Sequence, residues 1–180
     1  MSKKIHSQSY KITLTSALLN TPLGNMLAIS DEHALYFLGF CTRREIETEI
    51  KQLCNTLHAL IIPGTSNALE SIQKELDAYF NGTLRTFKTP FTLTGTPFQK
   101  KCWNALQRIP YGQTQSYAMQ AYAINNTSAH RAVGSANGKN TFAIIIPCHR
   151  VVNSNGKLGG YNGGIDRKQW LINFEKQNCN

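Results

Sequence analysis

The sequence predicts an α+β protein with a small sheet-and-helix first half and a mainly helical second half. Short apolar and β-branched runs, separated by turn-forming residues, occupy positions 10–40 and indicate strands. Longer segments with helical apolar spacing follow, and two short helices in the second half form a helix-turn-helix pattern. At 180 residues the chain is long enough to bury the core of one domain or of two small ones.

The first half contains three expected strands, followed by two expected helices. The strands form a small antiparallel sheet from residues 10–18, 23–30 and 34–40. Thr42 and Glu45 have the spacing of a capping box, which opens a helix through about His58. A second helix runs from Asn67 to Phe80, where Asn81-Gly82 stops it. No catalytic cluster is evident, so we expect residues 1–90 to be a scaffold domain.

The second half begins after a Thr-rich linker over residues 83–95, and we assign residues 91–180 to a second domain. Thr96 caps the next helix, Pro97 fits its first position and Gln99 completes a capping box, so a helix to about Arg108 is expected.

The helix-turn-helix pattern follows a turn at residues 110–112. A short helix over 116–123 and a tight break at 124–126 precede a helix that Thr127 or Ser128 caps and that ends near residue 138. Such pairs also occur by chance in helical proteins.

The carboxy-terminal segment combines an apolar run, a reactive-looking motif and a glycine-rich loop. Residues 142–146, FAIII, predict a strand that ends at Pro147. The glycines at 159–164 let the backbone pass close to a flat ligand, or else form a mobile surface loop. Asp166 is expected to cap a closing helix whose inward residues are Trp170, Leu171 and Phe174.

The positive charge of the chain is concentrated in its second half. Residues 1–90 hold 9 Lys/Arg and 8 Asp/Glu, whereas residues 91–180 hold 10 Lys/Arg and only Asp166 and Glu175 as acids. A one-sided basic field favours a polyanion, most simply nucleic acid. Solubility and attraction to acidic lipid are the alternative explanations.

The cysteines indicate free thiols. The sequence has no apolar stretch of signal-peptide or membrane-spanning length, so we expect a cytoplasmic protein. An odd number of cysteines, five, argues against a disulfide framework. No spacing typical of a zinc site occurs, and a site assembled from the distant His33, Cys41 and Cys54 is the alternative.

Cys148, His149 and Arg150 follow Pro147 directly. A free thiol with a pKa of about 8.5 is only a few per cent thiolate at neutral pH, and a nearby imidazole can activate it. The imidazole then needs a carboxylate to orient it, and Glu175 is our choice because Asp166 serves as a cap. An inert buried cysteine beside a solvent-facing histidine is the alternative interpretation.

These motifs resemble those of the O6-alkylguanine-DNA alkyltransferases, also called methylated-DNA–protein-cysteine methyltransferases. The resemblance covers residues 96–175 closely and the first half more loosely. It is carried by PCHRV, RAVGSANGKN, GGYNGG and RKQWLINFE, and in the first half by SALLNTPLGNMLAIS and IQKELDAYFNGTL. It implies a ribonuclease-H-like amino-terminal domain and a helix-turn-helix domain that enters the minor groove.

The resemblance also implies a role for each matching residue. Cys148 accepts the alkyl group, His149 deprotonates it through water, and Glu175 supports His149. Five residues receive DNA- or base-binding roles: Arg131 replaces the extruded base, Tyr117 contacts the flipped nucleotide, Asn140 ties the helix-turn-helix to the active-site strand, and Tyr161 and Lys168 lie around the guanine pocket. His130 stands where the family commonly has a small residue, and Thr141 where it commonly has proline, so we expect altered groove fit and a looser start of the strand.

We therefore predict a monomer, without cofactor or metal, that binds double-stranded DNA carrying O6-alkylguanine. It repairs that base, with O4-alkylthymine as a further substrate, by nucleotide flipping and irreversible transfer to Cys148. A cysteine hydrolase that regenerates its thiol is the rival enzyme. A damage sensor or a sequence-specific regulator is the rival binding protein.

Overall fold

The computed structural model describes residues 10–42 and 45–179, and it confirms the α+β class. A four-stranded sheet in the first half has the order β3-β2-β1-β4. It is built from β1 (Ile12–Leu19), β2 (Met26–Ser30), β3 (Leu35–Phe40) and β4 (Ala59–Pro63). Neighbours β1, β2 and β3 are antiparallel, whereas β4 runs parallel to β1.

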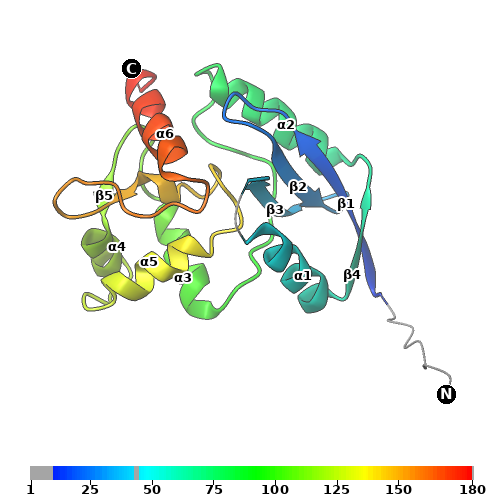
Figure 1. Ribbon diagram of the computed structural model, residues 1–180, viewed down its shortest axis with the longest axis horizontal. Helices are drawn as coiled ribbons and strands as arrows, with labels where there is room; N and C mark the ends of the chain where they lie inside the picture. Colours follow the sequence, from blue (N-terminus) through cyan, green and yellow to red (C-terminus); the bar gives the residue numbers. More distant parts are fainter. Residues whose placement is uncertain (1–9, 43–44, 180) are drawn as a thin grey trace.

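Two helices cover opposite faces of this sheet (Figure 1). Helix α1 (Ile46–Leu57) packs Leu53 against one face, and α2 (Asn67–Phe80) packs Leu69, Ile72 and Leu76 against the other. The α2 bounds agree with the prediction, and Ser66 caps the helix by accepting a hydrogen bond from the Leu69 amide. The sheet and α2 therefore enclose the main apolar core.

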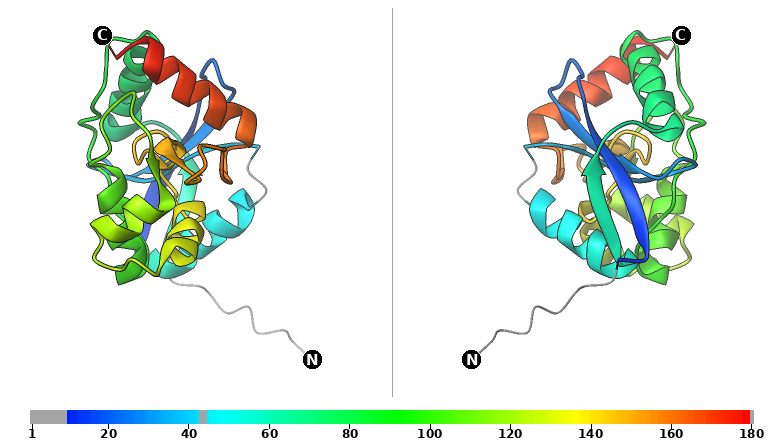
Figure 2. Two further views of the ribbon diagram at one scale, coloured as in Figure 1. Left: turned by 90° about the vertical axis from the view of Figure 1, so that its left-hand side faces the viewer. Right: turned by 90° about the vertical axis from the view of Figure 1, so that its right-hand side faces the viewer.

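The second half gathers its helices on one side of the molecule, away from β1 and β4 (Figure 2). They are α3 (Pro97–Leu106), α4 (Tyr117–Ala123), α5 (His130–Gly138) and α6 (Ile165–Gln177). The predicted Thr96–Gln99 capping box is present at α3. Short strands β5 (Gln115–Ser116) and β6 (Val151–Val152) pair in parallel beside them.

Helices α4 and α5 form the predicted helix-turn-helix. Ala121 and Ile124 pack on Val133 and Ala136 in a small apolar cluster that α3 completes. The buried side-chain amides of Gln120 and Asn137 donate to each other's oxygens, at 3.1 and 2.7 Å, and join the two helices. This packing fixes the angle at which α5 is presented to a partner.

The predicted strand over 142–146 is wrong. The segment is a turn in which Ile144 adopts a left-handed φ of 73°, and Cys148–Arg150 form a 3₁₀ turn, η1. Asn140 explains the turn, because its side chain bonds the Phe142 amide and the carbonyls of Phe142 and Ile146, groups that a strand would place in a ladder.

The turn is attached to the edge of the first-half sheet. The Leu38 amide of β3 donates to the Thr141 carbonyl, and the Ala143 amide donates back to Leu38, both at 2.8 Å. Phe142 and Ile146 enter the same core as β2, β3 and α2. The start of this segment is therefore held by β3. The loosening expected from Thr141 remains a prediction, because the bonded carbonyl would be present in proline as well.

Strand β4 was missing from our prediction, and three helix caps differ from it. Helix α1 begins at Ile46 with Glu45 as its N-cap and without a side-chain cap, so the capping box expected from Thr42 and Glu45 does not open it. Helix α5 begins after Ala129, not after Thr127 or Ser128. Helix α6 begins after Gly164, whose φ is 98°, so Asp166 lies in the first turn and is not the cap.

The inward face of α6 differs in part from the prediction. Trp170 is 37% exposed and stacks on Phe174 instead of facing inward, while Leu171 is buried as expected.

Within the described residues no group of three or more His, Cys, Asp or Glu side chains could hold a metal ion, so His33, Cys41 and Cys54 do not form such a site. No helix in the same part of the chain has the length and apolar character to cross a bilayer.

Candidate active site

The structure brings His149 and Glu175 together in the protein interior beside Cys148. Residue Glu175 projects from α6, and its Oε1 lies 2.8 Å from Nε2 of His149 on η1. Both side chains are almost fully buried, at 0% and 1% exposure. The predicted partnership of His149 with Glu175, and not with Asp166, is the one that the fold makes.

Electrostatics define the tautomer of His149. Burial raises the pKa of Glu175, but hydrogen bonds and charges from His149 and Arg150 outweigh it and lower the pKa from 4.5 to about 2. Burial also lowers the pKa of His149, so the imidazole is neutral at physiological pH. An ionised Glu175 only accepts hydrogen bonds, so Nε2 carries the proton and Nδ1 holds a lone pair. Nδ1 is buried and has no hydrogen-bond partner among the described residues.

Glu175 has further partners that fix its position. Arg150 donates Nε to Oε2 at 2.8 Å and a terminal nitrogen to Oε1 at 3.0 Å. The Gly112 amide donates to Oε2 at 3.2 Å, and the Tyr79 hydroxyl donates to Oε1 at 2.8 Å. Arg150 also donates to the Ile109 carbonyl at 2.6 Å, so it braces α6, η1 and the turn after α3 at once.

The sequence analysis did not identify Tyr79 as part of the site, although this residue of the first half contacts Glu175 directly. It is fully buried on α2, and burial followed by the nearby Glu175 charge raises its pKa well above 10. Its position on the apolar face of a helix resembles that of any core tyrosine, and Glu175 is 96 residues away in the chain. No sequence signal identified it, yet it places part of the scaffold in contact with the buried carboxylate.

Asn140 holds the thiol as well as the turn before it. Its Nδ2 lies 3.2 Å from Sγ of Cys148, and the same amide bonds the Ile146 carbonyl at 2.8 Å. The residue is buried two positions after the end of α5, so it links the helix-turn-helix to the cysteine, in keeping with the role that the resemblance implied. An amide donor pointing at sulfur favours the thiolate form over the thiol.

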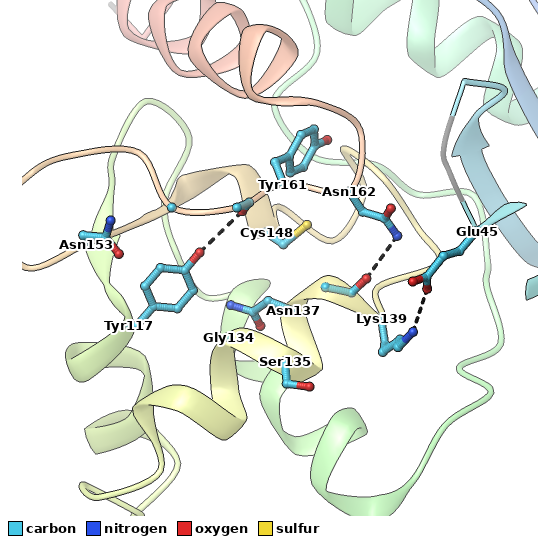
Figure 3. Close-up of a pocket in the computed structure, with 13 residues that line it drawn as sticks. Glu45, Tyr117, Gly134, Ser135, Asn137, Lys139, Cys148, Asn153, Tyr161 and Asn162 are labelled. Carbon is cyan, nitrogen blue, oxygen red and sulfur yellow. Dashed lines mark hydrogen bonds and ion pairs between the residues drawn. The ribbon is translucent and has the colours of Figure 1, made fainter.

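A cavity of about 460 Å³ opens in front of Cys148, which itself is 8% exposed (Figure 3). Tyr117 of α4 and Tyr161 of the glycine-rich loop line it, with the carboxy-terminal half of α5 opposite. Tyr161 lies edge-on to the His149 ring, with ring centroids 6.4 Å apart. A recess with aromatic walls and a thiol at one side suits a flat heterocycle.

The loop wall of the cavity is held by Lys168 and Tyr117. The ammonium of Lys168 donates to the carbonyls of Gly159 and Gly160, each at 3.3 Å, and lies 5.8 Å from the Tyr117 ring centroid. Burial lowers the pKa of Lys168 to about 8, and the nearby Cys148 acts in the opposite direction. A Cβ at Gly159 would lie 2.5 Å from the Tyr117 hydroxyl, so only glycine permits this close approach.

Arg131 lies apart from this cluster, on the exposed side of α5. It lines a neighbouring recess of about 270 Å³ with His130 and Asn153, and Tyr117 belongs to both recesses. Arg131 makes no hydrogen bond or ion pair with any residue that the structure describes, so its guanidinium is available to a partner. His130, one residue earlier, is also exposed and adds bulk to the same surface.

Comparisons with known proteins agree with this site. Residues 14–93 match the family model for the ribonuclease-like domain of 6-O-methylguanine DNA methyltransferase, and residues 97–177 match the model for its DNA-binding domain.

Two relatives and one solved structure match this chain over most of their length. A methylated-DNA–protein-cysteine methyltransferase from Methanosarcina acetivorans is 39% identical over 160 residues, which are 88% of this chain and 96% of that protein. One from Mycolicibacterium paratuberculosis is 50% identical over 142 residues, covering 78% and 86% of the two chains. The crystal structure of Mycobacterium tuberculosis OGT in complex with DNA is 37% identical, with a TM-score of 0.77 over 92% of this chain and 94% of that one. The chain belongs to the methylated-DNA–protein-cysteine methyltransferase family.

Proposed function

We propose that this protein repairs O6-alkylguanine in double-stranded DNA by moving the alkyl group irreversibly to Cys148. The observation that carries the proposal is a thiol at the wall of an aromatic-lined cavity, beside a neutral histidine that a buried, ionised Glu175 orients. The activity for which the relatives are named, transfer from methylated DNA to a protein cysteine, supports the same reaction.

The proposed chemistry follows from the His149 tautomer. With Nε2–H bonded to Glu175, the lone pair on Nδ1 takes the Cys148 proton, through a water molecule as the family resemblance implies. The thiolate attacks the alkyl carbon, the bond from that carbon to O6 breaks, and the departing guanine takes up a proton. A thioether and an unmodified guanine are the products.

Burial of the thiol implies that the damaged nucleotide leaves the helix. Cys148 is recessed, and a base stacked within a duplex does not reach the wall of such a cavity. We assign Arg131 to the gap that the base leaves, because it is exposed on α5 next to the cavity. Tyr117 then contacts the flipped nucleotide, and Tyr161 and Lys168 shape the guanine pocket.

The helix-turn-helix and the basic second half form the proposed DNA surface, with α5 in the minor groove. The division near residue 90, a monomeric state, a cytoplasmic location and activity on O4-alkylthymine remain predictions. The shared core of the two halves indicates that the first half supports the second through β3, α2 and Tyr79.

Mass spectrometry of the intact protein after reaction with O6-methylguanine duplex tests the proposal. We expect one added methyl group, mapped to Cys148 and not to Cys41, Cys54, Cys102 or Cys179. Cys148→Ala is expected to bind the duplex and remain unmodified. An unmodified native protein, or methylation at another cysteine, would contradict the proposal.

A further inference from the structure

Two carboxylates at the start of α1 contact the second half: Glu45, the residue before the helix, lines the cavity (Figure 3), and Glu49 of the first turn lies behind it. Glu49 accepts a hydrogen bond from Nδ2 of Asn162 at 3.3 Å. Glu45 pairs with Lys139 at 2.7 Å. Asn162, Glu45 and Lys139 all line the cavity in front of Cys148. A helix expected to be scaffold therefore reaches the pocket, through its N-cap residue Glu45 and through the bond from Asn162 to Glu49.

Asn162 connects three separate elements. Its Nδ2 also donates to the Gly138 carbonyl at the end of α5, at 3.1 Å, so one amide joins the glycine-rich loop to both α1 and α5. The two contacts share a single NH₂ group, which has two hydrogens to donate. The side-chain amide is thus fully used in holding the loop.

Asn162 fixes the middle of the loop, whose other attachments lie on either side of it. On the far side, Arg167 donates to the Gly163 carbonyl at 2.8 Å. Lys168 and Tyr117 bind the carbonyl groups of Gly159 and Gly160. Beyond them, the chain passes Tyr161, which faces His149, and enters α6 through Gly163-Gly164. Glycines at both ends of Tyr161 and Asn162 leave the backbone there free to adopt other conformations.

We propose that Glu49 and Asn162 are positioning residues that set the shape of the base-binding wall, and through it the affinity for the flipped alkylguanine. The inference rests on the proposed function, because it concerns the same cavity. Both side chains are half-buried, whereas the Glu45–Lys139 pair is exposed on both sides, at 49% and 53%. An exposed pair contributes little, so Glu49 and Asn162 are expected to provide most of the effect.

The inference separates binding of the base from reactivity of the thiol. Neither Glu49 nor Asn162 has a hydrogen bond to Cys148, His149 or Glu175 among their contacts described above. A loosened loop should therefore weaken guanine binding and leave the thiol's chemistry unchanged. Two reagents report the two properties: free O6-benzylguanine, which needs the pocket, and iodoacetamide, whose reaction at Cys148 needs the activated thiol but not the guanine pocket.

The test compares Glu49→Ala with Glu49→Gln and with Glu47→Ala in the full chain. Glu47 is a matched control because it also lies in the first turn of α1 and is exposed. We expect Glu49→Ala to raise the half-saturating concentration of O6-benzylguanine about three- to tenfold, the effect of losing one ordinary, half-buried hydrogen bond. The limiting rate at saturation and the iodoacetamide rate should stay within about twofold of the native protein, as for any change confined to binding.

Rescue distinguishes positioning from a general structural effect. Glu49→Gln keeps an acceptor oxygen and should remain within about twofold of native, and Glu47→Ala should match native. Asn162→Asp loses the donor and faces Glu49 with a second carboxylate, so it should lose at least as much as Glu49→Ala.

Equal half-saturation for Glu49→Ala and Glu47→Ala would overturn the inference. So would a parallel loss of the iodoacetamide rate in Glu49→Ala. Failure of the native protein to react with any alkylguanine would instead contradict the proposed function itself.

Discussion

Replacing Glu175 by glutamine removes one negative charge from the buried cluster and keeps the size of the side chain. Burial raises the pKa of Glu175, but His149 and Arg150 together lower it from 4.5 to about 2. This lowering corresponds to about 3 kcal/mol of stability at neutral pH, if the unfolded chain lacks these partners. Because the folded-state pKa is lowered, the contribution is complete above pH about 4.5 and is lost as the pH falls through about 2.

Urea unfolding at two pH values measures this contribution. We expect Glu175→Gln to reduce the free energy of unfolding by about 3 kcal/mol at pH 7, and the difference to narrow to about 1 kcal/mol near pH 3. A domain of ordinary stability would still fold. The control is Asp166→Asn, which removes an exposed carboxylate from the same helix and should change stability by about 0.5 kcal/mol, the size of a helix-dipole effect.

The same variant tests the role of His149. Without the charge of Glu175 the imidazole becomes a weaker base, so alkylation of Cys148 by iodoacetamide at pH 7 should slow by about 10²-fold, the lower range of general-base effects. The reaction should also need a higher pH to reach its maximum. A stability loss below about 1 kcal/mol at pH 7, or an unchanged pH–rate profile, would refute the assignment of Glu175 as the buried, charged partner.

Three other predictions follow from the described contacts. Tyr79→Phe removes one hydrogen bond to Glu175 and should lower the free energy of unfolding by about 1.5–3 kcal/mol. The control Tyr36→Phe removes a part-exposed bond to Asp31 and should lower it by less. Equal losses in the two variants would contradict a special contribution of the Tyr79–Glu175 bond. Arg131→Ala should slow repair of duplex far more than reaction with free O6-benzylguanine, and equal losses on both substrates would remove its role in the duplex. Binding to unmodified duplex should weaken with salt at a slope no steeper than about −6, because three of the ten Lys/Arg in residues 91–180 do not contact phosphates: Arg150 and Lys168 are buried and Lys139 is paired. A flat response, or a slope near −9, would contradict the proposed surface.

Local sequence signals predicted the elements that depend on local chemistry. Helix α2 and the capping box of α3 were predictable because a cap, an apolar face and a terminating glycine all lie within one segment. Strand β4 was not predictable in this way. It pairs in parallel with β1, about 47 residues earlier, and its apolar run directly follows a helix of similar character.

The catalytic residues Cys148, His149 and Glu175 were predictable for chemical reasons, whereas the residues that hold them in place were not. Scarcity of acids in the second half indicated Glu175, although one premise, capping by Asp166, is wrong. Tyr79 and Glu49 give no sequence signal because each meets its partner across a long stretch of chain, and the GGYNGG motif marks the loop that holds Asn162 without indicating its bond to Glu49. The turn at 142–146 was predicted as a strand because burial of every side chain in an apolar run does not distinguish the two.

Reaction of the native protein with a several-fold molar excess of O6-methylguanine duplex tests the central claim most directly. Attack by Cys148 on the alkyl carbon forms a thioether, and neither water nor His149 can release a group bound in that way, so each molecule should react once. We expect the amount of repaired guanine to rise to the amount of protein and stop there, with every molecule methylated at Cys148. Continued repair beyond one guanine per protein, with Cys148 recovered as a free thiol, would contradict irreversible transfer and indicate a cysteine hydrolase.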